Sequence, residues 1–237
     1  MHPLFFQPDI QKGTHFLAPD ESKHCAKVLR MKTGDLIQIT DGMGFFYTAH
    51  IQSANPVKCT FEVITRSPGP GKKFHIHLVV APTKNPQRME WMVEKCVEIG
   101  VVEFSFILCE HSEPGRLNFQ RLQKITVSAM KQSNQAILPI LHEPVPFSEF
   151  LRTTKDQTSV SRFIAVVDPS NPIHLHQAEK KNTFSTLLIG PEGDFSEKEK
   201  KSAMAHGFLP VSLGDTRLRT ETAGLMGAHL LTLLPNQ

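Results

Sequence analysis

Two glycine turns near the C-terminus carry charged residues that could act on a bound ligand. The first glycine turn, Gly190–Gly193 in the run LLIGPEGDFSEKE, follows an apolar stretch and places Glu192 between its glycines. The second glycine turn, Leu213–Arg219 in the run SLGDTRLRTETAG, carries Arg217 and Arg219. In an extended backbone, residues two apart point to the same side, so both guanidinium groups would face one ligand. A carboxylate in one turn and arginines in the other suit a zwitterionic or cationic ligand together with an anionic partner.

The first glycine turn also has a purely structural explanation, because any tight connection from a strand to a helix favours glycine. A ligand site has more support, since ligands of open parallel sheets bind beyond the carboxyl ends of the strands. Two features argue against a phosphate-binding P-loop. The run lacks Gly-Lys-Ser/Thr, and the carboxylates of Glu192 and Asp194 would repel an anion.

Two histidine pairs have the spacing of metal ligands on a strand. His75 and His77 would share one side of a strand, and His174 and His176 repeat the pattern. Neither pair is accompanied by cysteine or carboxylate residues at ligand spacing. We therefore expect no metal.

A set of basic residues lies in or near one expected helix, and it could form a stripe that faces phosphates. A plain solvated helix face explains the same residues equally well, and the sequence leaves both explanations open. The set consists of Arg116, Arg121, Lys124 and Lys131.

The elements expected around the two glycine turns alternate between strands and helices. Apolar runs with strand character are separated by amphipathic helical stretches, the last of which is Glu221–Leu234. Ser196 and Glu199 form a capping box for the helix after the first glycine turn. Thr220 is the expected N-cap of the last helix. The alternation predicts a mostly parallel sheet covered by helices on both faces.

The N-terminal part has a different pattern, typical of a small β-rich unit. Alternating apolar residues on both sides of the run DGMG predict a hairpin. A helix is expected over Glu21–Met31, with Asp20 as its N-cap. The stretch RSPGPGKK, Arg66–Lys73, is rich in proline and glycine and is the expected linker. We therefore expect two domains, residues 1–68 and 74–237.

The composition is that of a folded protein without a membrane segment. The 237 residues are 40% hydrophobic, enough for a sizeable core, and the net charge of +3 permits a polyanionic partner without requiring one. The four cysteines are widely spaced without a CxxC motif and are expected to be reduced thiols, most of them buried. No signal peptide is apparent, and no apolar run approaches the roughly 20 residues needed to cross a bilayer. We expect a soluble, cytoplasmic protein.

Several runs along the chain resemble the RsmE family, the 16S ribosomal RNA uridine-N3 methyltransferases of the SPOUT superfamily. In the N-terminal part these runs are ESKHCAKVLRMKTGD and TDGMG. In the larger part they are RMEWMVEKCVEIGV, KQS, LLIGPEGDFSEKE and LGDTRLRTETA. The likeness extends essentially from end to end, and the last two runs are the most specific. Asp194 departs from the pattern, since glycine is common at its position.

The resemblance implies a fold and a reaction. The fold would be an N-terminal β-rich, PUA-like RNA-binding barrel followed by an α/β SPOUT methyltransferase domain with a deep trefoil knot, and the protein would act as a homodimer. The reaction would be the transfer of a methyl group from S-adenosylmethionine to uridine N3 of 16S rRNA, in the assembled small ribosomal subunit and without a metal.

The resemblance also implies roles for individual residues. Arg219 is the first candidate for stabilising charge on the uracil and Arg217 the second, while Glu192 and Glu221 are alternatives for the general base. Contacts with S-adenosylmethionine are expected from Gly190, Pro191, Glu192, Gly193, Leu213, Gly214, Leu218 and Arg219. Contacts with RNA are expected from Arg30, Lys84, Arg88, Arg116, Arg121, Lys124, Lys131 and Gln132.

Two other functions fit parts of the sequence. A non-catalytic RNA-binding module that retains the fold would bind RNA without binding S-adenosylmethionine. The intact glycine turns and Arg219 argue against this function. An enzyme with another nucleotide cofactor would carry a dinucleotide glycine fingerprint or a P-loop, and the sequence has neither.

Overall fold

The chain folds into two compact units. The computed structural model describes residues 2–71, 74–113, 117–154, 159–167, 173–178 and 184–234. The N-terminal unit comprises Met1–Gly71 and Val127–Leu138, and the C-terminal unit comprises Lys72–Thr126 and Pro139–Gln237. The expected domain boundaries assign all of Val127–Leu138 to the second domain, and they remain a prediction.

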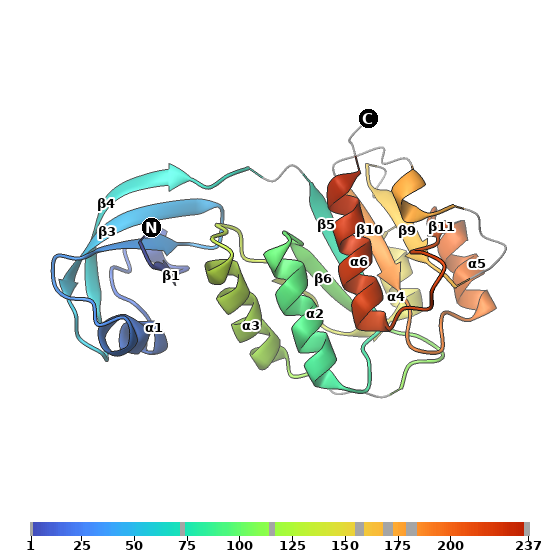
Figure 1. Ribbon diagram of the computed structural model, residues 1–237, viewed down its shortest axis with the longest axis horizontal. Helices are drawn as coiled ribbons and strands as arrows, with labels where there is room; N and C mark the ends of the chain where they lie inside the picture. Colours follow the sequence, from blue (N-terminus) through green and yellow to red (C-terminus); the bar gives the residue numbers. More distant parts are fainter. Residues whose placement is uncertain are drawn as a thin grey trace. The chain divides into compact units, whose positions relative to one another are not determined.

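The N-terminal unit contains a sheet of four strands in the order β1-β2-β3-β4 (Figure 1). Strands β2 and β3 form the predicted hairpin, which is therefore confirmed. In its turn, Oδ1 of Asp41 accepts hydrogen bonds from the backbone N–H of Met43 at 2.7 Å and of Phe45 at 3.2 Å. The strands are β1 (Leu4–Phe6), β2 (Leu36–Thr40), β3 (Phe45–Ser53) and β4 (Thr60–Pro68), so the start of the expected linker belongs to β4.

The expected helix of this unit is present, but its start was predicted wrongly. Helix α1 spans Pro19–Lys23 and continues into a π-helical turn, His24–Val28. Its N-cap is Ala18, without a side-chain hydrogen bond, and not Asp20. The fixed φ of Pro19 suits the first helical position, so the helix begins before Asp20. Asp20 instead lies in the first turn, where its negative charge favours the helix dipole.

The segment Val127–Leu138 is bonded to the hairpin turn of the N-terminal unit. The carbonyl oxygen of Ala136 accepts hydrogen bonds from the Thr40 hydroxyl at 3.1 Å and from the backbone N–H of Gly44 at 2.9 Å. Lys131 forms an ion pair with Glu21 of α1. Both Lys131 and Glu21 belong to runs that resemble the RsmE family, and this pair gives them a structural role.

The described part of the C-terminal unit contains a seven-stranded sheet in which every pairing is parallel. The order is β11-β9-β10-β5-β6-β7, and β8 also pairs with β6. The mostly parallel sheet predicted from the sequence is therefore confirmed. Its strands are β5 (His75–Val80), β6 (Glu103–Leu108), β7 (Ile140–Leu141), β8 (Val145–Pro146), β9 (Ser161–Ala165), β10 (Phe184–Ile189) and β11 (Leu209–Val211).

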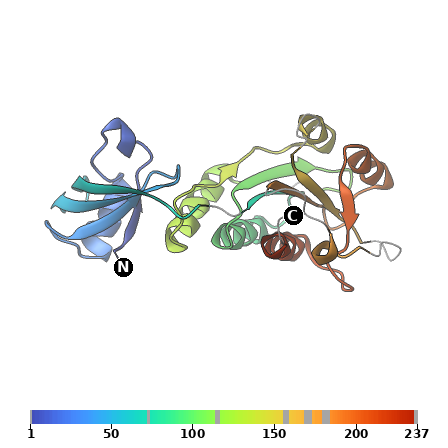
Figure 2. The same cartoon turned by 90° about the horizontal axis from the view of Figure 1, so that it is seen from above.

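Helices cover both faces of this sheet, as predicted (Figure 2). One face carries α2 (Pro86–Glu98) and α6 (Thr220–Leu233). The other carries α4 (Phe147–Thr153) and α5 (Glu197–Ala205), whose apolar side chains share one core with β5, β9 and β10. Helix α3 spans Phe119–Gln132. Central strands covered on both faces explain why their sequences are apolar at successive positions and do not alternate.

The cysteines and the helix lengths bear on two expectations from the sequence, those of reduced thiols and of no membrane segment. Cys25, Cys59, Cys96 and Cys109 are all free and buried, so the predicted thiols are confirmed. Among the described residues, no helix combines the length and apolar character that a bilayer crossing requires.

Two glycines allow α6 to lie very close to its neighbours. A Cβ atom added to Gly224 would lie 2.6 Å from Sδ of Met92, and one added to Gly227 would lie 2.5 Å from Cδ2 of Leu187. Real Cβ contacts essentially never fall below 3.0 Å. The close approach of α6 to β10 and α2 therefore depends on the absence of side chains at these two positions.

Replacing Gly227 by Ala should destabilise the C-terminal unit, because the new methyl group has to displace the fully buried Leu187. We expect a loss of about 1–2 kcal/mol, since overpacking costs ~1–3 kcal/mol and the better helix propensity of Ala returns up to ~1 kcal/mol. Lys201→Ala, at an exposed position of α5 in the same unit, is the control and should change stability little. Urea denaturation checks both variants; equal stability of Gly227→Ala and the wild type would contradict the close packing.

Candidate active site

The two glycine turns border one pocket at the carboxyl ends of β9, β10 and β11. The pocket has a volume of about 670 Å³. It is the arrangement expected for a ligand site of a parallel sheet, because the loops that follow the strands meet there. Of the residues predicted to bind the cofactor, all but Gly193 line it, namely Gly190, Pro191, Glu192, Leu213, Gly214, Leu218 and Arg219; Arg217 lines it as well.

The first glycine turn is closed by a hydrogen bond from the backbone N–H of Asp194 to the carbonyl oxygen of Pro191 at 2.9 Å. Asp194 has φ of 62°, a left-handed conformation that glycine adopts most easily. Its carboxylate compensates by accepting a hydrogen bond from the N–H of Phe195 at 2.8 Å and by pairing with Lys200 at 3.0 Å. An aspartate can therefore stand where the family commonly has glycine.

Helix α5 begins directly after this turn. The Ser196 hydroxyl accepts a hydrogen bond from the N–H of Glu199, and the Glu199 carboxylate accepts one from the N–H of Ser196. The predicted capping box is thus confirmed. The cap fixes where the turn ends and the helix starts.

The glycines of the first turn make room for protein atoms. A Cβ atom at Gly190 would lie 3.0 Å from the ring of Phe195, and one at Gly193 would lie 3.0 Å from Cβ of His111. Nδ1 of His111 also lies 3.1 Å from the carbonyl oxygen of Asp194. The sequence analysis, which expects both glycines to contact the cofactor, did not indicate that Phe195 and His111 fill the space beside them.

Helix α6 connects the second glycine turn to the first. Arg219 is the N-cap of α6, and Thr220 occupies the first helical position, so the prediction of Thr220 as the N-cap was wrong. The Thr220 hydroxyl instead donates a hydrogen bond to the carbonyl oxygen of Gly190 at 3.1 Å. Because this bond joins turns that are 30 residues apart in the chain, no local sequence signal indicates it.

The charged side chains of the two turns are available to a ligand. Arg217, Arg219 and Glu192 are exposed, and none of the three forms an ion pair with another described residue. Leu213 and Leu218 are partly buried and add apolar surface to the pocket. The site therefore combines apolar walls with unpaired charges of both signs.

A smaller cavity of about 330 Å³ is also lined by Glu192. Lys84, Asn85, Arg88 and Glu113 complete its lining. Lys84 pairs with Glu113 at 3.1 Å. The sequence analysis gave Glu192 a role separate from that of Lys84 and Arg88. The fold places all three in the lining of this one cavity.

Glu221, the second candidate for the general base, is not among the residues that line the pocket. It is buried, and its Oε1 lies 3.6 Å from Nε of Arg88. Its Oε2 is buried and accepts no hydrogen bond from the part of the chain that the structure describes. Glu221 therefore neutralises Arg88 more readily than it reaches a reacting group.

The remaining residues predicted to contact RNA are distributed over both units. Arg121 pairs with Glu90 of α2 at 2.6 Å, whereas Lys124 is exposed. Lys131 forms an ion pair with Glu21, and the neighbouring Gln132 is exposed. Arg30 is exposed with a φ of 54°, and Arg116 lies outside the described residues.

Comparison with known proteins shows which family the chain belongs to. A model described as the RNA methyltransferase domain matches residues 70–232, and a model described as the RNA methyltransferase PUA domain matches residues 17–64. A curated relative from Buchnera aphidicola, ribosomal RNA small subunit methyltransferase E, is 28% identical over 238 residues, which cover 96% of this chain and 91% of the relative. The chain belongs to the RsmE family of RNA methyltransferases. The resemblance seen in the sequence is thereby confirmed.

Solved structures of related proteins agree with this assignment. A probable rRNA-methyltransferase from Porphyromonas gingivalis is 41% identical with a TM-score of 0.90, and the match covers 98% of each chain. The ribosomal RNA small subunit methyltransferase E of Neisseria gonorrhoeae, solved bound to S-adenosyl methionine, is 25% identical with a TM-score of 0.84. That match covers 99% of this chain and 98% of the other. The RsmE family thus accounts for both units of the fold.

Replacing Thr220 by Val should loosen the first glycine turn, because it removes the hydroxyl that bonds Gly190 while keeping the side-chain shape. We expect a loss of about 1 kcal/mol in stability, the usual net contribution of one hydrogen bond. Hydrogen exchange of the backbone amides of Gly190, Glu192, Gly193 and Asp194 should become faster. Thr222→Val is the matched control, since the Thr222 hydroxyl forms no hydrogen bond to the described residues. Equal exchange in both variants would show that the bond does not hold the turn.

Proposed function

We propose that this protein transfers a methyl group from S-adenosylmethionine to N3 of a uridine in 16S rRNA. The observation that carries the proposal is the single pocket lined by both glycine turns, with Glu192 and Arg219 among its lining residues. The RsmE relative solved with S-adenosyl methionine has the same fold over nearly the whole chain, which supports the choice of methyl donor.

The residues of the pocket fit S-adenosylmethionine. Its volume of about 670 Å³ suits a ligand of this size. Leu213 and Leu218 offer apolar surface for an adenine ring, and Glu192 offers a carboxylate for the positively charged sulfonium or amino group. When bound, S-adenosylmethionine supplies an electrophilic methyl group.

Arginine in the second glycine turn would activate the uridine. N3 of uracil is a poor nucleophile while it carries its proton, so the enzyme has to favour the anion. A guanidinium group beside O2 or O4 lowers the pKa of N3 and stabilises the charge that develops there. Arg219 is the first candidate and Arg217 the second, because both line the pocket without an ion-pair partner among the described residues.

Glu192 is our choice for the general base that removes the N3 proton. It borders both the large pocket and the smaller cavity that Lys84 and Arg88 line. Glu221 is less suitable because it is buried and paired with Arg88.

The target uridine has to be accessible. A base pair would occupy N3, so the nucleotide has to be unpaired, non-canonically paired or extruded. We propose the assembled small subunit as substrate, a cytoplasmic location, and a trefoil knot formed by the two glycine turns, all of them implied by membership of the RsmE family. None of these steps requires a metal.

A non-catalytic RNA-binding module is the alternative, and calorimetry separates it from the enzyme. Titration of the protein with S-adenosylmethionine or its demethylated product should show one binding site per chain. Leu213→Asp, which places a charge in the apolar wall of the pocket, should abolish the heat of binding. RNA binding without any cofactor binding by the folded wild-type protein would favour the alternative.

Arg219→Ala should lower the rate of methyl transfer by roughly 10²-fold or more, the effect of removing one preorganised donor to a developing charge. Binding of S-adenosylmethionine should weaken much less. The measurement is single-turnover methylation of small-subunit particles, with cofactor affinity determined separately. If the rate is unchanged, or if rate and cofactor affinity fall equally, Arg219 does not have this role.

Lys124→Ala provides the contrast, because Lys124 is an exposed cation of α3 outside the pocket. It should weaken RNA binding and reduce the salt dependence by about one unit of log slope for one lost phosphate contact. Lys124 is preferred to Lys131, whose ion pair with Glu21 would also be lost on substitution.

We also propose a homodimer formed through α6. Met226 is 43% exposed and Leu233 is 65% exposed on this helix, so apolar surface remains after α6 has packed on its own sheet. A second chain could cover that surface. Light scattering at micromolar concentration should give the mass of a dimer for the wild type and of a monomer for Met226→Asp; a monomeric wild type would contradict the proposal.

A further inference from the structure

Histidine and carboxylate side chains gather at the amino ends of β5 and β6, at the opposite end of these strands from the pocket. His77 lies on β5, Glu103 is the first residue of β6, and His142 directly follows β7. One ligand atom from each of the three lies within 4.8 Å of the others. Sequence spacing did not reveal this group, because its members come from three separate segments.

Backbone pairing places the three residues. His77 and Glu103 are direct partners in the pairing of β5 with β6. The backbone N–H of His142 donates to the carbonyl oxygen of Phe104 at 2.9 Å, which holds His142 against β6. The ring of His77 also packs edge-on against Phe150 of α4, with 5.8 Å between the ring centroids. The group therefore belongs to the rigid part of the sheet.

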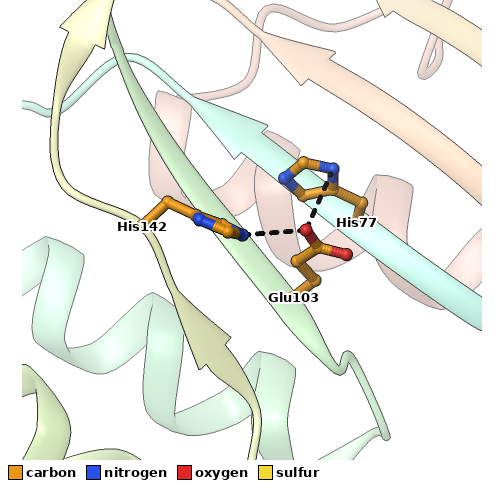
Figure 3. Close-up of side chains that lie close together, drawn as sticks. All are labelled: His77, Glu103 and His142. Atoms are coloured by element: carbon orange, nitrogen blue, oxygen red, sulfur yellow. Dashed lines mark hydrogen bonds and ion pairs between the residues drawn. The ribbon is translucent and has the colours of Figure 1, made fainter. Parts of the chain in front are cut away.

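Both imidazole rings point at the same carboxylate oxygen (Figure 3). Oε1 of Glu103 lies 2.8 Å from Nε2 of His142 and 3.8 Å from Nδ1 of His77. The longer distance exceeds that of a hydrogen bond. Donors about 2.0–2.1 Å from one zinc ion in tetrahedral geometry lie about 3.3 Å apart, so small side-chain movements would bring all three into coordination.

Two further residues have the positions that partners of metal ligands take. Nε2 of His77 lies 2.8 Å from the Ser105 hydroxyl. If Nε2 carries the proton and donates it to Ser105, the lone pair of Nδ1 is directed at Glu103. The second carboxylate oxygen, Oε2 of Glu103, lies 3.0 Å from Nε2 of His75. Such partners orient ligands and fix the tautomer of a coordinating histidine.

The three side chains differ in their exposure to solvent. Those of His77 and Glu103 are 17% and 22% exposed. The side chain of His142 is 47% exposed, which gives an ion access from solvent.

We propose that His77 Nδ1, Glu103 Oε1 and His142 Nε2 bind one Zn²⁺ ion, with water as the fourth ligand. Two imidazoles, one carboxylate and an open position form a donor set that zinc commonly takes. The ion would join β5, β6 and the segment after β7. Because the site lies at the far end of the strands from the pocket, it is independent of the proposed methyl transfer.

Zinc titration of chelator-treated, tag-free protein tests the site. Calorimetry should find one Zn²⁺ per chain, and Co²⁺ should give the visible absorption of a four-coordinate complex. His142→Ala should abolish this binding, and its exposed position leaves the core intact. Ser105→Ala, which keeps all three ligands, should weaken binding by roughly 10–100-fold, as expected for a residue that orients a ligand. Zinc should raise the unfolding temperature of the wild type and leave that of His142→Ala unchanged.

A second close histidine pair supplies the matched control. Nδ1 of His174 and Nδ1 of His176 lie 2.6 Å apart on exposed side chains, and among the described residues no carboxylate joins them in a group of three ligands. The double variant His174→Ala/His176→Ala should retain full zinc binding. The proposal is wrong if the wild type binds no zinc, if His142→Ala binds it as well as the wild type does, or if the control variant loses it. In those cases the group is a hydrogen-bonded network without a metal.

Discussion

The close packing of α6 on the parallel sheet is the constraint on which the pocket depends. At Gly224 and Gly227 the helix lies so close to the side chains of Met92 and Leu187 that an added Cβ atom would force them to shift. This approach brings the first residue of α6 to the end of β10, where the Thr220 hydroxyl reaches the Gly190 carbonyl. The two glycine turns thereby form one site, although the chain between them forms α5 and β11.

The charge distribution of the pocket follows from this packing. The first turn follows the buried end of β10 and the second follows Val211, the buried last residue of β11, while their charged side chains remain in solvent. Arg217, Arg219 and Glu192 are exposed, and no described neighbour neutralises them by an ion pair. Arg88, in contrast, is balanced by the buried Glu221. Preorganised but unpaired charges are what a reaction with a developing anion requires.

The parallel sheet also separates two kinds of chemistry. Loops that contain glycines meet at the carboxyl ends of the strands. At the amino ends of β5 and β6, the histidine–glutamate group is formed by two strand residues and by His142, which follows β7. Substitutions in the loops can change the lining of the pocket. The histidine–glutamate group is instead fixed by the pairing of His77 with Glu103. A bound ion at the amino ends would stabilise the sheet without entering the pocket.

Local patterns in the sequence determined the elements, and tertiary packing decided how they combine. The apolar runs, the Ser196–Glu199 capping box and both glycine turns are short-range features, so the parallel sheet, the start of α5 and most of the pocket lining could be predicted. The bond from Thr220 to Gly190, the cavity shared by Glu192 and Arg88, the placement of Val127–Leu138 with the N-terminal unit, and the meeting of His77, Glu103 and His142 could not. Each of these joins residues far apart in the chain, and their proximity arises only from strand register and helix packing, which one sequence does not encode as a local pattern.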